Sequence, residues 1–107
     1  MVQDAFGAER PWMSWVTVGE VAHHVERRHG ADKAALVVRR LRAAAALDDV
    51  TAERVLAAAH IKARHPIALA DCFAAATAAA RDATLLTGVP KLLERDVGCR
   101  VLDLRPT

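Results

Sequence analysis

Aromatic side chains are scarce in this sequence, and their scarcity limits the kind of core that the chain can form. Its 107 residues contain two phenylalanines, two tryptophans and no tyrosine: Phe6, Phe73, Trp12 and Trp15. Alanine supplies much of the 53% hydrophobic share. Because alanine favours helices but buries little area, the sequence predicts a helix-rich protein with a thin core. The length predicts a single domain over residues 1–107.

Cysteines and long apolar runs are also scarce. Cys72 and Cys99 are far apart and lack a metal-site spacing, which favours a reducing cytosol over a disulfide framework. No apolar run approaches the ~20 residues of a membrane helix. The N-terminus, with Asp4, Glu9 and Arg10, has no apolar signal-peptide segment. We therefore expect a cytoplasmic protein without a membrane partner.

The excess of positive charge is too small to indicate a function by itself. The net charge is +2 and the isoelectric point is near 8.8, so the placement of the charges matters more than their sum. Two basic clusters fall on predicted helices: Arg27 with Arg28, and Arg39, Arg40 with Arg42. They fit contacts with RNA phosphates, contacts with an acidic protein segment, or a solvated helix surface.

Short apolar segments alternate with helical patterns along the chain. Residues 12–17, 83–87 and 100–104 fit β-strands. The helix signals between them are a capping box of Thr17 and Glu20, a stop at Gly30, caps at Asp32 and Thr51, a first-turn Pro66, and a brief helix near residues 91–95. Strands separated by helices favour parallel pairing, so the sequence predicts an α/β fold.

Nearly the whole chain resembles the PIN-domain family, with the matching segments in the family's order. These segments are residues 14–21, 61–76, 83–88 and 101–104. The toxin ribonucleases of bacterial toxin–antitoxin pairs, the VapC type, are the most similar group. The resemblance implies a parallel sheet flanked by helices and metal-dependent cleavage of an RNA phosphodiester. It also implies an antitoxin partner and RNA as a further partner. A homo-oligomer is expected as well, on the separate ground of unpaired strand edges.

The resemblance implies about four acidic residues at the carboxyl ends of the strands, the oxygen ligands that hard cations such as Mg²⁺ or Mn²⁺ prefer. Glu20 falls on the family's acid near the start of a helix, and Asp71 falls on its acid early in a later helix. Thr87 is an accessory candidate at the end of a strand. Val89 stands where the family has another acid.

The family's first acid lies on an N-terminal strand that has no counterpart in this sequence. Residues 2–6 resemble the end of the helix that follows that strand. We therefore expect a chain that is incomplete at its N-terminus and lacks the central strand of the family's sheet. Unpaired strand edges would remain beside the gap, which favours oligomer formation.

Each candidate site residue also has a structural interpretation. Glu20 completes the capping box with Thr17, which is worth on the order of 1 kcal/mol. Asp71 is favoured by the helix dipole, by ~0.3–1 kcal/mol. Thr87 could simply end its strand. The other polar clusters are assigned to caps and solvated surface: Asp48, Asp49, His23, His24, His60 and His65.

Two carboxylates are enough for one weak metal site, because Mg²⁺ is often held by one or two carboxylates together with water and substrate phosphates. They are too few for a pair of ions ~3.5–4 Å apart. The leading prediction is a toxin-type PIN protein of endoribonuclease ancestry with little or no activity of its own. The alternative is a non-catalytic module for dimerisation or antitoxin binding. A third possibility, an unrelated small helical protein, would be rejected by parallel pairing of residues 83–87 with 100–104.

Overall fold

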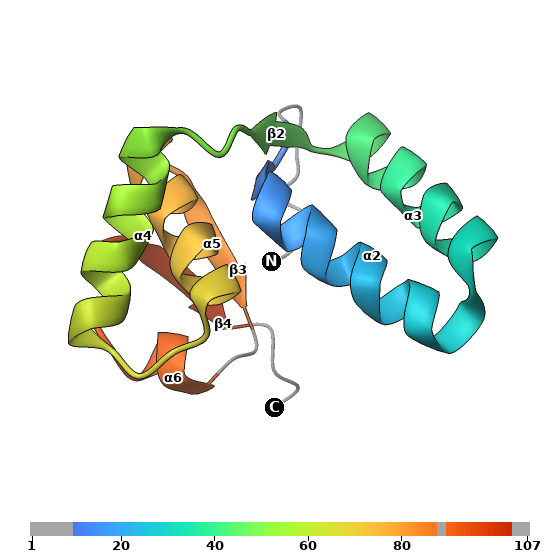
Figure 1. The fold of residues 1–107 in the computed structure, drawn as a ribbon. Helices are drawn as coiled ribbons and strands as arrows, with labels where there is room; N and C mark the ends of the chain where they lie inside the picture. Colours follow the sequence, from blue (N-terminus) through green and yellow to red (C-terminus); the bar gives the residue numbers. More distant parts are fainter. Residues whose placement is uncertain (1–9, 88–89, 104–107) are drawn as a thin grey trace.

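A computed structural model of the chain describes residues 10–87 and 90–103 (Figure 1). Helices contain most of these residues, and each strand is only three or four residues long. In chain order the elements are β1 (Trp12–Ser14), α2 (Trp15–His29), α3 (Ala31–Ala44), β2 (Ala46–Asp48), α4 (Ala52–Arg64), α5 (Leu69–Ala80), β3 (Thr84–Thr87), α6 (Pro90–Leu93) and β4 (Arg100–Asp103).

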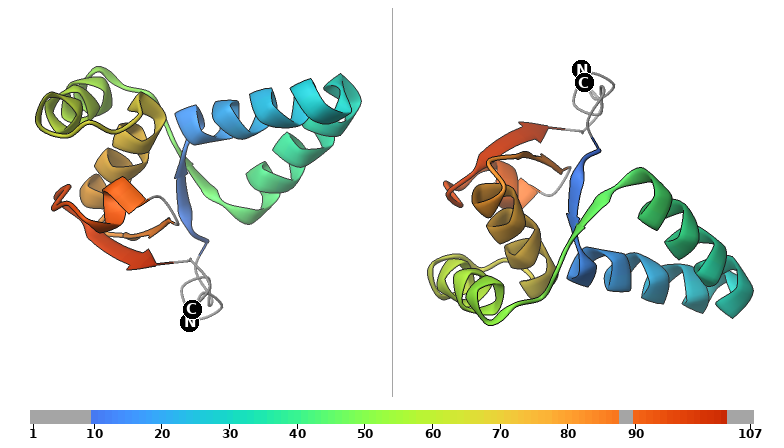
Figure 2. Two further views of the ribbon diagram at one scale, coloured as in Figure 1. Left: turned by 90° about the horizontal axis from the view of Figure 1, so that it is seen from below. Right: turned by 90° about the horizontal axis from the view of Figure 1, so that it is seen from above.

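The described strands form two separate parallel pairs. In the first pair β1 lies beside β2, with Ser14 opposite Asp48. In the second pair β3 lies beside β4, with Thr87 opposite Asp103. No strand joins β1 to β3 within residues 10–87 and 90–103, and Figure 2 shows the two pairs next to each other. The expected helix-rich α/β fold with parallel strands is confirmed, and the unrelated helical protein is rejected.

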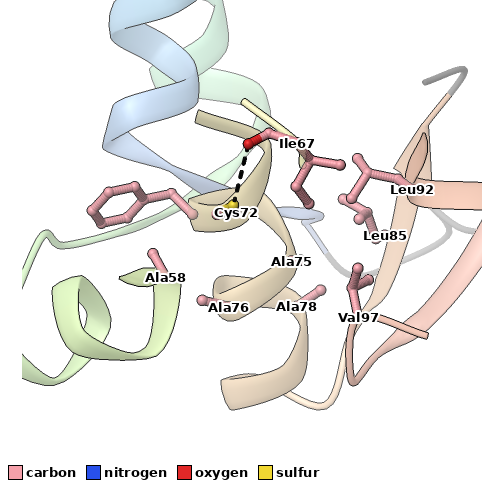
Figure 3. Packing of buried hydrophobic residues seen from close by; sticks show 10 residues of the cluster. Ala58, Ile67, Cys72, Ala75, Ala76, Ala78, Leu85, Leu92 and Val97 are labelled. Atoms are coloured by element: carbon pink, nitrogen blue, oxygen red, sulfur yellow. Dashed lines mark hydrogen bonds between the residues drawn. The ribbon is translucent and has the colours of Figure 1, made fainter. Parts of the chain in front are cut away.

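Helix α5 lies at the centre of the molecule and touches both strand pairs as well as α2 and α4. Its apolar character explains this position, because half of its twelve residues are buried. The core cluster is built mainly on this helix, and Figure 3 shows it with side chains from α4, β3 and α6: Ala58, Ile67, Cys72, Phe73, Ala75, Ala76, Ala78, Leu85, Leu92 and Val97. Phe73 is its only aromatic member, so the predicted thin alanine core is confirmed.

The start of α2 differs from the prediction. The helix begins at Trp15, and Ser14 is its N-cap, with the Ser14 hydroxyl accepting a hydrogen bond from the Val16 amide at 3.1 Å. The predicted strand over residues 12–17 is therefore too long, and the capping box of Thr17 and Glu20 does not exist. Both residues lie inside the helix, because the earlier hydroxyl already satisfies a free amide of the first turn.

Three other predicted helix starts can be compared with the structure. Thr51 caps α4 as predicted, because its hydroxyl accepts from the Arg54 amide at 3.1 Å. Asp32 does not cap α3, since the helix begins one residue earlier and Gly30 is its N-cap, with φ at +90°. Pro66 precedes α5 instead of lying in its first turn. Strand β2 was not predicted, because its sequence of alanine, leucine and aspartate carries little β-propensity.

Some sequence-based expectations fall outside the described residues: the helix end at residues 2–6, Gly88 with Val89, and the end of the last strand at Leu104. Within the described part of the chain, no helix combines the length and the apolar character needed to cross a bilayer.

Candidate functional site

Asp71 is the third residue of α5, in its first turn, and its side chain is only partly accessible. Burial raises the pKa of its carboxyl, and the Glu20 carboxylate raises that pKa further. The usual effect of a helix N-terminus on an acid is the opposite, since the dipole stabilises the charged form. Asp71 is therefore held in a site where its negative charge is unfavourable.

Glu20 reaches this site from the other half of the chain. It is the sixth residue of α2, a helix that contacts α5, and its side chain is 50% exposed. Glu20 pairs with the exposed His24 one turn later, at 3.4 Å between Oε2 and Nε2. Such an exposed pair contributes little to stability. The tertiary structure thus brings together two predicted site acids that are far apart in sequence.

Thr87 is the last residue of β3, and only 8% of it is exposed. Its register partner is Asp103, the last residue of β4, so both lie at the carboxyl edge of this strand pair. Only a short turn separates α5 from β3, and the two elements are in contact. The first turn of α5, with Asp71, consequently points toward the same edge.

The described residues supply fewer acids than a complete metal site would need. Within residues 10–87 and 90–103, no three residues of the types His, Cys, Asp and Glu form a group that could hold a metal ion. Glu20 and Asp71 therefore stand as a pair, and Val89 lies outside the described residues. The arrangement offers two carboxylate oxygen donors from two helices.

Asp48 contradicts its assignment to the solvated surface, since only 1% of it is exposed. Arg54 donates to its carboxylate through Nε at 2.6 Å and through Nη2 at 3.1 Å, and Arg81 Nε donates at 2.9 Å. The Thr77 hydroxyl donates at 3.0 Å. Burial alone would raise the pKa of Asp48, but these hydrogen bonds outweigh it and lower that pKa. Two partners lie far away in sequence, so no local signal could identify this group.

The two tryptophans are held by arginines. The Arg81 guanidinium lies 4.1 Å from the centre of the Trp12 ring, and that of Arg42 lies 5.5 Å from the centre of the Trp15 ring. Trp12 remains 39% exposed. Trp15 is the first residue of α2 and not part of β1, so the predicted strand over residues 12–17 does not hold both tryptophans. The rest of the basic clusters, Arg27, Arg28, Arg39 and Arg40, is exposed.

A shallow hollow of about 410 Å³ lies away from the acid pair. It lies between the end of α5 and the start of β4. Its lining residues are Ala78, Ala79, Asp82, Ala83, Asp96, Gly98, Cys99 and Arg100. Arg100 is bonded there to the Asp82 carbonyl and carboxylate, and burial raises the pKa of the Cys99 thiol. A raised pKa favours the protonated thiol, which is a poor nucleophile.

Comparison with known proteins places the chain among characterised folds. A family model described as "PIN domain" matches residues 2–88, and no curated protein matches significantly. DNA-bound VapBC2 from Rickettsia felis has a TM-score of 0.76 at 15% identity, covering 97% of this chain and 82% of its own. VapBC-1 from nontypeable Haemophilus influenzae has a TM-score of 0.72 at 19% identity, and the match covers 95% of this chain and 80% of the other. DNA-bound VapBC from Salmonella typhimurium has a TM-score of 0.71 at 21% identity, and the match covers 86% of this chain and 74% of the other.

Proposed function

This chain belongs to the PIN-domain family, and on that basis we propose that it is a toxin-type member in which Glu20 and Asp71 form one weak divalent-metal site. The reaction of its ancestry is metal-dependent cleavage of an RNA phosphodiester. Because the described residues supply only this pair of acids, we propose that the chain by itself cleaves RNA weakly or not at all.

The observation that carries the proposal is the approach of Glu20 on α2 to Asp71 on α5, two helices that are in contact. The raised pKa of Asp71 agrees with this approach. Its causes are burial and the nearby Glu20 carboxylate, so two negative charges repel each other in a partly desolvated place. A divalent cation would relieve this repulsion, and carboxylate oxygens are the ligands that Mg²⁺ and Mn²⁺ prefer. When bound, the ion would supply positive charge opposite a substrate phosphate. Thr87 is proposed as an accessory contact to the substrate.

The proposed partners are an antitoxin, RNA and a second copy of the chain. The similar structures are VapBC complexes, which supports an antitoxin as partner. The exposed arginines on α2 and α3 fit either RNA phosphates or acidic protein segments. A cytoplasmic location, where such partners meet, is part of the same proposal.

Metal binding can be tested by Mn²⁺ calorimetry on the purified chain. We expect weak binding to the wild type and at least about tenfold weaker binding to Asp71→Asn, because one of only two carboxylates is lost. Asp49→Asn is the matched control, since Asp49 is exposed and lies outside the site. Equal affinities for wild type and Asp71→Asn would remove Asp71 from the site.

The same titrations predict a pH dependence. Binding requires the ionised carboxylate, and protonation competes for Asp71 at a higher pH than for an ordinary aspartate because its pKa is raised. Mn²⁺ affinity should therefore already weaken as the pH falls toward that raised pKa. An affinity that is unchanged until the pH reaches the ordinary aspartate pKa of about 3.9 would contradict this assignment.

Weak or absent nuclease activity is a separate statement with its own test. Incubation of the chain with RNA and Mn²⁺ should give little cleavage. Robust Mn²⁺-dependent cleavage that disappears in Asp71→Asn would contradict it, and would show that the remaining groups suffice for the reaction.

A non-catalytic module for dimerisation or antitoxin binding is the second candidate. It is favoured by the lack of a third acid beside Glu20 and Asp71 among the described residues. Calorimetry separates the two functions, because a pure scaffold gives no Mn²⁺ heat while keeping its affinity for a partner.

A further inference from the structure

Asp48 lies where the two elements that carry the candidate acids meet. Its backbone, at the end of β2, is paired with Ser14, the N-cap from which α2 starts. Its side chain accepts hydrogen bonds from Thr77 and Arg81 near the end of α5. One buried residue therefore joins the origin of α2, which carries Glu20, to the helix that carries Asp71.

Two further contacts strengthen this junction. Arg81 also lies 4.1 Å from the ring centre of Trp12 in β1, so α5 is attached to both strands of the first pair. Arg54, at the start of α4, donates to both oxygens of the Asp48 carboxylate, at 2.6 and 3.1 Å. We call these five residues, Asp48 with Trp12, Arg54, Thr77 and Arg81, the Asp48 clasp.

Glu20 and Asp71 lie equally far along their helices from the residues that meet Asp48, which are Ser14 before α2 and Thr77 in α5. Glu20 is six residues after Ser14, and Asp71 is six residues before Thr77. At 1.5 Å per residue, each separation is about 9 Å along its helix axis. Because α2 and α5 are in contact, a change of their relative orientation at the clasp would be transmitted directly to the two carboxylates.

The divided arrangement of strands makes this side-chain junction more important. In a continuous sheet, backbone hydrogen bonds would fix β1, and with it α2, relative to β3. Within residues 10–87 and 90–103 no strand makes that connection. The position of α2 relative to β3 therefore depends on packing against α5 and on the polar contacts of the clasp.

We propose that Asp48 is a positioning residue, and that the Asp48 clasp sets the separation of α2 and α5 and thereby the spacing of the Glu20 and Asp71 carboxylates. The effect on metal affinity rests on the proposed function. The effect on the separation of the helices does not.

Metal affinity is measured first, with variants that change one contact of the clasp. Thr77→Val removes the hydroxyl that donates to Asp48 but keeps the shape of the side chain, and Thr77→Ser restores the hydroxyl. We expect Thr77→Val to weaken Mn²⁺ binding severalfold, because a looser junction lets the two carboxylates leave the spacing that the ion needs. Thr77→Ser should bind within about twofold of wild type. Arg100→Met is the matched control, since Arg100 pairs with Asp82 outside the clasp.

The separation of the helices is measured independently of any metal. Spin labels are placed on exposed positions, Arg28→Cys in α2 and Ala79→Cys in α5, in a background with Cys72→Ala and Cys99→Ser. Pulsed electron resonance then gives the distance distribution between the labels. Arg81→Met, which removes a partly exposed member of the clasp, should shift or broaden this distribution, while Arg100→Met should not. All measurements are made at temperatures where the variants are fully folded.

The outcomes separate the two proposals. A changed distance distribution with no Mn²⁺ binding by the wild type supports the clasp and overturns the metal site. Unchanged distances and unchanged affinity in both Thr77→Val and Arg81→Met, even with lower stability, overturn the positioning role. Such a result would show that the ion pairs of Asp48 only stabilise the fold.

Discussion

Two aspartates illustrate how differently the same side chain behaves in this molecule. Asp48 is buried among donors, and its hydrogen bonds to Arg54, Arg81 and Thr77 lower its pKa despite the burial. Asp71 is buried less and has a carboxylate as its neighbour, so its pKa is raised. A lowered pKa in the folded state stabilises the protein at neutral pH, whereas a raised one destabilises it. The two acids thus have different roles: Asp48 stabilises the fold, and Asp71 is the candidate metal ligand.

Replacing Asp48 should be costly at neutral pH. Asp48→Asn leaves Arg54 and Arg81 without their anion, and we expect a loss of about 3 kcal/mol in the free energy of unfolding, as for a broken buried ion pair. Urea unfolding at pH 7 measures it. Asp49→Asn, a change at the exposed neighbour, should stay within about 0.5 kcal/mol of wild type.

The cost should also depend on pH. Because the pKa of Asp48 is lower in the folded than in the unfolded chain, its stabilisation is complete above the unfolded value of about 3.9. It is lost as the pH falls through the lowered folded value. The difference between wild type and Asp48→Asn should therefore shrink in strong acid. A difference that stays constant down to that range would show that the charge of Asp48 is not what stabilises the protein.

At the scale of the elements, hydroxyl caps decide where helices begin. Ser14 ends β1 and caps α2, and its side chain is 2% exposed. Thr51 caps α4 in the same way at the surface. Both hydroxyls accept a hydrogen bond from an amide of the first turn that has no partner within the helix.

The cap at Ser14 predicts a contrast between two neighbouring substitutions. Ser14→Ala should lower the free energy of unfolding by about 1 kcal/mol, because the Val16 amide loses its acceptor. Thr17→Ala should change it by less than about 0.5 kcal/mol, since Thr17 lies inside α2 and caps nothing. Thermal or urea unfolding of the two variants measures the difference. The reverse ranking would restore the capping box of Thr17 and Glu20.

At the scale of the whole molecule, the two strand pairs lie next to each other and both contact α5, but they do not form one sheet (Figure 2). Each of β1 and β3 is hydrogen-bonded to one described strand only. A strand edge that pairs with no other described strand can take up a further strand, which supports the proposed association with a second copy of the chain.

We accordingly expect oligomers whose population rises with protein concentration, as measured by light scattering after size-exclusion chromatography. Leu86→Lys places a charge on β3, beside its edge, and should shift the chain toward monomer. Leu56→Lys tests the competing surface, because Leu56 is 69% exposed on α4. A shift caused by Leu56→Lys and not by Leu86→Lys would place the contact on the helix.

The sequence by itself determined the helix-rich α/β class, the end of α2 at Gly30, the cap at Thr51 and the parallel partners β3 and β4. Each of these depends on neighbouring residues or on the order of the elements. Only the tertiary structure decided the rest. It made Asp48 a buried anion, because its partners Thr77 and Arg81 come from a helix far along the chain. It also brought Glu20 close enough to raise the pKa of Asp71, since burial and electrostatic repulsion depend on distance in space.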